Sequence, residues 1–115
     1  MPRSNVARGA YYKGRTRKWL IEMGWQVADL EVIRYVGAGI PVKRDQFGAD
    51  LLAVSAKRLL FVQVKSGKHA LKTITAARRT FEAFQFPPFA ERWIVAWLPR
   101  ARQPHVVNAG TSVRK

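Results

Sequence analysis

The stretch FGADLLAVSAKRLLFVQVKSG (47–67) has an aspartate at the front of one apolar run and a Gln-Val-Lys triplet at the end of the next: Asp50, Gln63 and Lys65. A carboxylate, an amide oxygen and an amine brought together offer a place for a metal ion and a nucleophile. The sequence contains no cysteine, so oxygen atoms or one of two histidines must hold any metal. Neither histidine has a partner at metal-binding spacing. A hard divalent cation is therefore the metal that these residues would accept.

Two short apolar runs, 51–54 and 59–64, predict the element that positions these residues. The four residues between the runs have the length and turn chemistry of a β-hairpin. If the runs pair end to end across this turn, Asp50 lies directly opposite Gln63, with β carbons about 5 Å apart. Lys65 follows two residues later and points to the same face. The alternative for each residue is structural: a strand-start turn, an edge amide and a solvated strand end.

The rest of the chain predicts an α/β sandwich with a mixed sheet, in the order α-β-β-β-α-β. Apolar residues at spacings of three and four predict a helix over 9–23, with a glycine stop. Loose alternation over 25–37 predicts a partly exposed strand broken by a turn or bulge. Residues 40–48 are expected to form a basic loop, 74–84 a second helix and 92–99 a last buried strand.

Length and composition predict one domain over residues 1–115, with mobile basic ends at 1–7 and 103–115. The chain is 48% hydrophobic, which is too apolar for a mainly disordered protein. It has no apolar stretch approaching the roughly 20 residues that cross a bilayer. We therefore expect no membrane association and no export, and a cytoplasmic location.

The net charge of +14, from 21 basic and seven acidic residues, indicates a polyanionic partner, with nucleic acid as the first expectation. A ribosome-like or merely basic soluble protein is the alternative that charge alone leaves open. The basic side chains that flank the polar triad in sequence are the expected DNA-binding residues, and they would meet phosphates rather than bases. These are Lys13, Arg15, Arg17, Lys18, Arg34, Lys43, Arg44, Lys68, Lys72, Arg78 and Arg79.

The order helix, strand, hairpin starting with Asp, (Glu or Gln)-x-Lys, helix, strand resembles the PD-(D/E)XK nuclease superfamily. Within it, the chain is similar to the small archaeal-type Holliday junction resolvases, which phages also carry. The similarity covers 8–25, 48–54, 59–67 and 92–99. It implies a restriction-endonuclease-like sandwich and a Mg²⁺-dependent endonuclease, with Mn²⁺ as a substitute metal. The implied reaction is the resolution of four-way DNA junctions by paired nicks, in recombination and repair, without a nucleotide cofactor.

The resemblance also implies catalytic roles for the polar triad. Asp50 would be the anchoring carboxylate of the metal. Gln63 stands where the family usually has Glu, so its neutral amide oxygen would ligate together with the backbone carbonyl of Val64. Lys65 would orient or help to deprotonate the attacking water and stabilise charge on the phosphate.

Two departures from the family pattern keep other functions open. Lys13 stands where the family usually has a first-helix Glu, and a lysine cannot ligate Mg²⁺. Glu22 and Asp45 are the candidates for a replacement ligand. The loop before Asp50, GAGIPVKRDQFG, also differs from the family's glycine-serine loop. The alternatives are a non-catalytic basic DNA-binding module of the same fold, or a nuclease that acts on other DNA structures.

A resolvase needs two active sites, and a chain of 115 residues supplies one, so we expect a twofold homodimer. The segment FEAFQFPPF (81–89) is more aromatic than a small core needs. Phe84, Phe86 and Phe89 are the expected interface residues, with ordinary core packing as the alternative reading.

Overall fold

The structure is a computed structural model that describes residues 5–30, 32–36, 40–44 and 47–110, with side chains for 8–30 and 47–110. Its elements follow in chain order. They are α1 (Asn5–Glu22), β1 (Gln26–Asp29), β2 (Val32–Val36), β3 (Ile40–Arg44), β4 (Leu51–Val54), β5 (Leu59–Ser66), the 3-10 helix η1 (Ala70–Thr73), α2 (Ile74–Glu82), β6 (Ala90–Trp97) and β7 (His105–Gly110).

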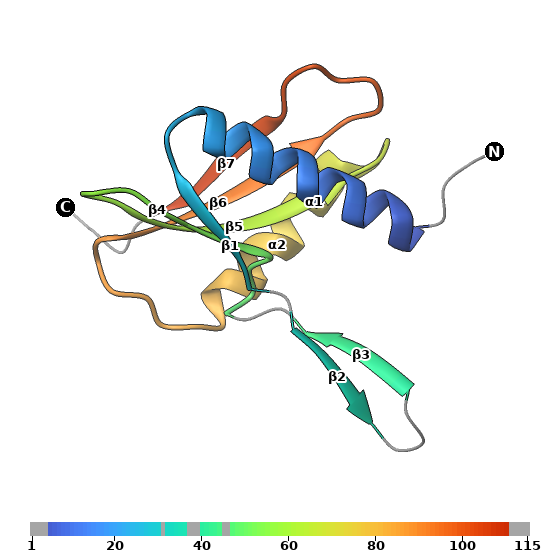
Figure 1. The fold of residues 1–115 in the computed structure, drawn as a ribbon, viewed down its shortest axis with the longest axis horizontal. Helices are drawn as coiled ribbons and strands as arrows, with labels where there is room; N and C mark the ends of the chain where they lie inside the picture. Colours follow the sequence, from blue (N-terminus) through green and yellow to red (C-terminus); the bar gives the residue numbers. More distant parts are fainter. Residues whose placement is uncertain (1–4, 31, 37–39, 45–46, 111–115) are drawn as a thin grey trace.

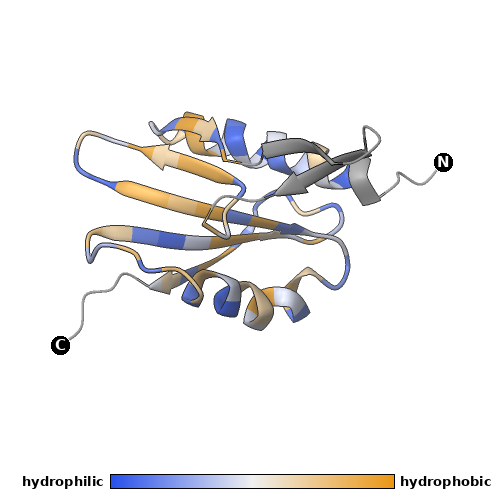
Figure 2. Cartoon of the chain, turned by 90° about the horizontal axis from the view of Figure 1, so that it is seen from below, coloured by the Kyte–Doolittle hydropathy of each residue, from blue (hydrophilic) through white to orange (hydrophobic). Residues whose placement is uncertain are grey.

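The predicted α/β sandwich is confirmed. Five strands form a mixed sheet in the order β1-β4-β5-β6-β7, in which only the β5–β6 pair is parallel among the described strands. The crossover between these parallel strands passes through η1 and α2. Helix α1 covers one face of the sheet and α2 the other (Figures 1 and 2). No described helix is both long enough and apolar enough to cross a membrane.

Helix α1 is fixed to the sheet by a buried apolar stripe and one hydrogen bond. Leu20 is fully buried against strand residues that include Val62 and Val95. The Trp97 indole N–H donates to the Thr16 hydroxyl oxygen at 2.8 Å, deep in this layer. The helix ends at the predicted glycine stop, where Gly24 has a φ of +101°. The helix therefore has a fixed position over the sheet.

Helix α2 packs a smaller core on the opposite face. Ala77 and Phe81 are buried there together with Ile94 of β6. Arg78 and Arg79 are exposed, as the helical pattern of this segment predicts.

The basic loop predicted over 40–48 is wrong, because residues 40–44 form β3. This strand pairs with β2, and together they make a separate two-stranded sheet that extends from the body (Figure 1). The single broken strand predicted over 25–37 is likewise two strands in two sheets. Basic residues within 40–44 suggested a loop, but positive charge does not prevent a strand from pairing with its neighbour.

The predicted mobile end at 103–115 contains an ordered strand, β7, at the edge of the main sheet. It pairs with β6, and Val107 and Ala109 pack against the α2 core. Six residues with weak alternation carried too little signal for a sequence prediction, and pairing with a buried neighbour supplies the order. At the other end, α1 begins at Asn5, before the predicted start at residue 9.

Candidate active site

The predicted hairpin pairs in the expected register, with Val54 opposite Leu59. The open end of the hairpin departs from a regular ladder at Asp50. The Asp50 N–H donates to the Val62 carbonyl at 2.8 Å, and Asp50 Oδ2 accepts the Val64 N–H at 2.8 Å. These two bonds reach the residues on either side of Gln63. Asp50 therefore lies across from Gln63, and its carboxylate is tied to β5 itself.

Gln63 is the unusual residue of this site, because it is a buried polar side chain with an unsatisfied atom. It is 5% exposed, and its Oε1 has no hydrogen-bond partner among the described residues. Leaving a buried acceptor unpaired costs about 1–3 kcal/mol. A buried acceptor of this kind is suited to a cation or a donor that arrives with a ligand.

Lys65 follows Gln63 by two residues on β5 and is half-buried. Gly67, whose φ is +103°, follows the last residue of β5. A Cβ added to Gly67 would lie 3.3 Å from Cζ of Arg8, so glycine allows α1 to place a guanidinium at this end of the sheet. Arg8 was not among the predicted DNA-binding residues. Its position depends on how α1 docks, and no sequence spacing reports that.

The chain enters the site through a tight turn against α2. Phe47 and Gly48 both have positive φ, 57° and 72°. A Cβ on Gly48 would lie 2.9 Å from Thr80 Cγ2, so a larger residue would have to displace α2 or the turn. The backbone just before Asp50 is thus held by packing.

Lys13, at the position of the family's helix glutamate, faces an aspartate. Its Nζ lies 3.9 Å from Asp29 Oδ2, and Arg17 contacts Asp29 Oδ1 at 3.4 Å. Asp29 ends β1, opposite Leu51, and the next residue donates its N–H to the Asp50 carbonyl. Asp29 is therefore a half-exposed carboxylate on the strand beside β4 that pairs with α1, and the sequence analysis did not single it out. Asp29 is the last residue of β1, and the sequence pattern did not show where this strand ends.

The structure does not bring Glu22 to Asp50. Glu22 is the last residue of α1, nine positions after Lys13, which is about 13 Å along a helix. Three residues later, Trp25 lies under the guanidinium of Arg58, which belongs to the β4–β5 turn. That turn is at the opposite end of the hairpin from Asp50. Glu22 is thus placed toward the other end of the hairpin from Asp50, and Asp45 lies outside the described residues.

The donor set that remains fits a hard divalent cation. It comprises the Asp50 carboxylate, the buried amide oxygen of Gln63 and the carbonyl of Val64, all of them oxygen donors. In the described part of the chain, no three His, Cys, Asp or Glu residues gather into a metal cluster. The set is therefore poor in charge, with one carboxylate where the family pattern has more.

The expected DNA-binding cations lie on both faces of the sheet. Arg15 stacks over Trp97 at 4.4 Å, and Lys18 lines a groove beside α1. Lys68 and Lys72 are exposed directly after β5, close in sequence to Lys65, and Arg78 and Arg79 are exposed on α2. For the remaining three, in the β2–β3 hairpin, the structure describes the backbone alone. These are Arg34, Lys43 and Arg44.

The three expected interface phenylalanines differ in their surroundings. Phe86 packs inside its own chain, with ring centroids 4.9 Å from Phe61 and 6.0 Å from Phe81. Phe86 is thus partly buried against the α2 core, as the core-packing alternative expects, and its place in an interface stays a prediction. Phe84 and Phe89 are 40% and 67% exposed, so they remain candidates for an interface.

Comparison with known proteins gives a fold relative. No family model and no curated protein matches the sequence. Among solved structures, the chain is similar to Hjc of Archaeoglobus fulgidus, a Holliday junction resolvase from an archaeal hyperthermophile. The match has a TM-score of 0.50 and 18% identity, and it covers 89% of this chain and 73% of that one. The chain therefore shares a resolvase-like α/β fold.

Proposed function

We propose that this protein is a Mg²⁺-dependent, structure-selective DNA endonuclease, and that its substrate is the four-way junction. The observation that carries the proposal is the contact between the Asp50 side chain and β5. Its carboxylate accepts the Val64 N–H at 2.8 Å, beside the buried and unpaired Oε1 of Gln63. A structural hairpin gains nothing from an unsatisfied buried amide.

The residues of the site would have separate roles in phosphodiester hydrolysis. Asp50, Gln63 Oε1 and the Val64 carbonyl would hold the divalent ion, with Mn²⁺ as a substitute. When bound, such an ion polarises the phosphate and lowers the pKa of a water. Lys65 would orient the attacking water and offset the negative charge that develops on the phosphate. The backbone bonds of Asp50 would hold these groups in place before DNA binds.

The fold relative and the charge support a branched DNA substrate. The solved relative is a Holliday junction resolvase. A net charge of +14 suits a large phosphate surface, and the exposed cations lie on both sheet faces rather than in one narrow stripe. We propose that the active form is a twofold homodimer, because paired nicks require two sites. Its interface would use the exposed rings of Phe84 and Phe89.

A specific observation supports a second candidate, a basic DNA-binding module without cleavage. Lys13 and Gln63 stand where the family pattern has carboxylates, which leaves Asp50 as the single anion of the donor set. A site with one anion would bind Mg²⁺ weakly. A nuclease of this fold that acts on flaps or ends is the remaining variant of the first proposal.

Cleavage of labelled DNA separates these functions. The substrates are a four-way junction, a flap and a linear duplex of matched sequence, each with Mg²⁺ and with EDTA. The proposal predicts paired nicks in the junction with Mg²⁺ alone. Metal-dependent cutting of the flap but not of the junction would show that the substrate is a flap and not a four-way junction. Junction binding in a mobility shift, without cutting at any Mg²⁺ concentration, would establish the binding module.

A further inference from the structure

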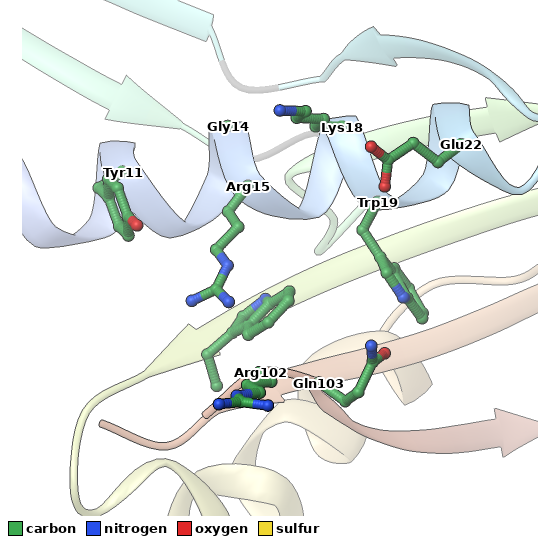
Figure 3. A pocket seen from close by; sticks show the side chains of 9 residues that line it. Tyr11, Gly14, Arg15, Lys18, Trp19, Glu22, Arg102 and Gln103 are labelled. Atoms are coloured by element: carbon green, nitrogen blue, oxygen red, sulfur yellow. The ribbon is translucent and has the colours of Figure 1, made fainter. Parts of the chain in front are cut away.

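A groove with a volume of about 570 Å³ runs between α1 and the loop that joins β6 to β7 (Figure 3). We call it the α1 groove. Its aromatic lining consists of Tyr11, Trp19 and Trp97, and its cations are Arg15, Lys18 and Arg102. The volume falls within the range of roughly 300–1,000 Å³ that is common for small-ligand sites.

Helical spacing brings the α1 residues of the groove onto one face. Tyr11, Arg15, Lys18 and Glu22 follow at intervals of four, three and four, so their side chains line a single stripe. Gly14 adds no side chain between them, and nothing lies within 4 Å of where its Cβ would be. The helix surface is therefore open at Gly14.

The floor of the groove is rigid. The Trp97 ring is buried, and its N–H donates to Thr16 Oγ1 at 2.8 Å. The guanidinium of Arg15 lies over this ring, 4.4 Å from its centroid. Arg15 is thus held in place by a cation–π contact before any ligand arrives.

Two aromatic rings that line the α1 groove are partly exposed to solvent. Tyr11 is 45% exposed, and its ring meets Tyr12 edge to face at 4.9 Å. Trp19 is half-buried and packs against Trp93 at 6.4 Å. Each ring is braced by a neighbouring aromatic, so stacking a flat ligand on it costs little conformational entropy.

The charge of the groove favours an anion that carries polar edges. Lys18 and Arg102 are exposed, and neither forms an ion pair with an acidic residue that the structure describes. Glu22 is the acidic member of the lining, and Gln103 adds an amide. The groove thus combines cations that can contact phosphates with a carboxylate and an amide that can hydrogen-bond to the edges of bases.

We propose that the α1 groove binds unpaired nucleotides of single-stranded DNA. Bases stack on Tyr11 and Trp19, while Lys18 and Arg102 contact the phosphates between them. Glu22 accepts hydrogen bonds from N–H groups on the base edges, such as the ring N–H of thymine. A duplex does not fit this chemistry, because its bases already stack on each other. The inference goes beyond the proposed nuclease function, since it uses none of Asp50, Gln63 and Lys65.

Fluorescence anisotropy with a labelled oligothymidylate of about twelve nucleotides tests the site, in EDTA so that metal-dependent cutting is silent. Tyr11→Ala is paired with Ile21→Ala, a 51% exposed apolar residue of α1 outside the groove. Arg102→Ala is paired with Lys57→Ala, which removes one exposed cation from the β4–β5 turn. We expect Tyr11→Ala to raise Kd about fivefold or more, because a stacked base contributes roughly 1–3 kcal/mol.

Comparison within the pairs decides the outcome. The proposal requires a larger loss in each groove variant than in its control, and tighter binding of the oligothymidylate than of an abasic strand of equal length. Equal losses within both pairs would overturn it, because bulk positive charge would then explain all binding. A photocrosslink from a bromodeoxyuridine strand to the unaltered protein gives a readout independent of variant folding. Crosslinks at Tyr11 or Trp19 support the site, and crosslinks confined to other elements refute it.

Discussion

The carboxylate of Asp50 is hydrogen-bonded to the backbone N–H of Val64 at 2.8 Å, so the proposed metal ligand is bound to the strand that carries Lys65. This bond fixes the distance between two proposed catalytic groups without a metal. An asparagine at position 50 can accept the same N–H through its amide oxygen. Replacing the aspartate by asparagine therefore removes the charge and preserves the shape.

We expect Asp50→Asn to reduce junction cutting by about 100-fold or more, since a metal supplies several kcal/mol of transition-state stabilisation. Junction binding in a mobility shift should be retained, because it depends on many Lys and Arg contacts. Asp29→Asn is the matched control, an exposed carboxylate on the neighbouring strand that pairs with Lys13 and Arg17. Cutting by Asp50→Asn at the parent rate would show that the hairpin end is structural.

Lys65→Ala should separate metal binding from chemistry. The lysine is proposed to align the water and offset charge on the phosphate, so its loss should slow cutting by about 100-fold while the metal ligands remain. The Mg²⁺-induced rise in melting temperature should stay as in the parent. Lys57→Ala, at the other end of the hairpin, should alter neither property. Loss of the Mg²⁺ effect in Lys65→Ala would place this side chain in the support of the metal ligands.

Gln63 allows a test that does not depend on cutting. Gln63→Glu should lower the melting temperature in EDTA, because it buries a carboxylate near Asp50. With Mg²⁺, Gln63→Glu should instead have a higher melting temperature than the parent protein. Its Mg²⁺ concentration for half-maximal stabilisation should be roughly three- to tenfold lower, as an added anionic ligand predicts. Gln63→Met should match or exceed the parent melting temperature in EDTA, since it removes an unsatisfied amide. Identical Mg²⁺ titrations for the parent and both variants would exclude Gln63 from the metal site.

The sequence was informative where a residue's position follows from strand periodicity. Asp50 and Gln63 could be placed opposite each other because a short turn fixes the hairpin register, and Val54 does pair with Leu59. The buried runs and the helix stop at Gly24 carried equally local signals. Local patterns therefore predicted the sheet centre and the proposed catalytic groups.

Features that depend on docking between distant segments could not be predicted in this way. Arg8 reaches the end of β5 only because α1 crosses the sheet at one angle, and Asp29 reaches Lys13 for the same reason. Strand β7 has weak alternation and is ordered by pairing with β6. In each case the determining contact joins residues far apart in sequence.

An ion pair at the far end of the hairpin predicts a pH dependence of stability. Arg58 donates two hydrogen bonds to Glu91, each 2.6 Å long, and these bonds lower the pKa of Glu91 below its ordinary 4.5 and raise that of Arg58. A depressed carboxyl pKa stabilises the fold above the unfolded value, and this is lost as pH falls through the folded value. Arg58 is half exposed, so Glu91→Gln should cost only about 0.5–1 kcal/mol near pH 7. Urea unfolding at pH 7 and pH 3 should show this difference shrinking; a constant difference would contradict an ionic origin.

The two phenylalanines of the 81–89 segment with opposite surroundings should respond oppositely to substitution. Phe89 is 67% exposed within its own chain, so Phe89→Asp should preserve the fold of the chain while shifting the mass in light scattering from dimer to monomer. Phe86 packs on Phe61 and Phe81 and under the guanidinium of Arg92, 5.1 Å from its ring. Phe86→Ala should therefore lower the free energy of unfolding by about 2–3 kcal/mol, because it opens a cavity at the edge of the α2 core. If paired nicking needs the dimer, Phe89→Asp should also convert double cuts into single nicks on a four-way junction. A parent protein that is monomeric at all measured concentrations would remove the dimer and the paired-nick mechanism together.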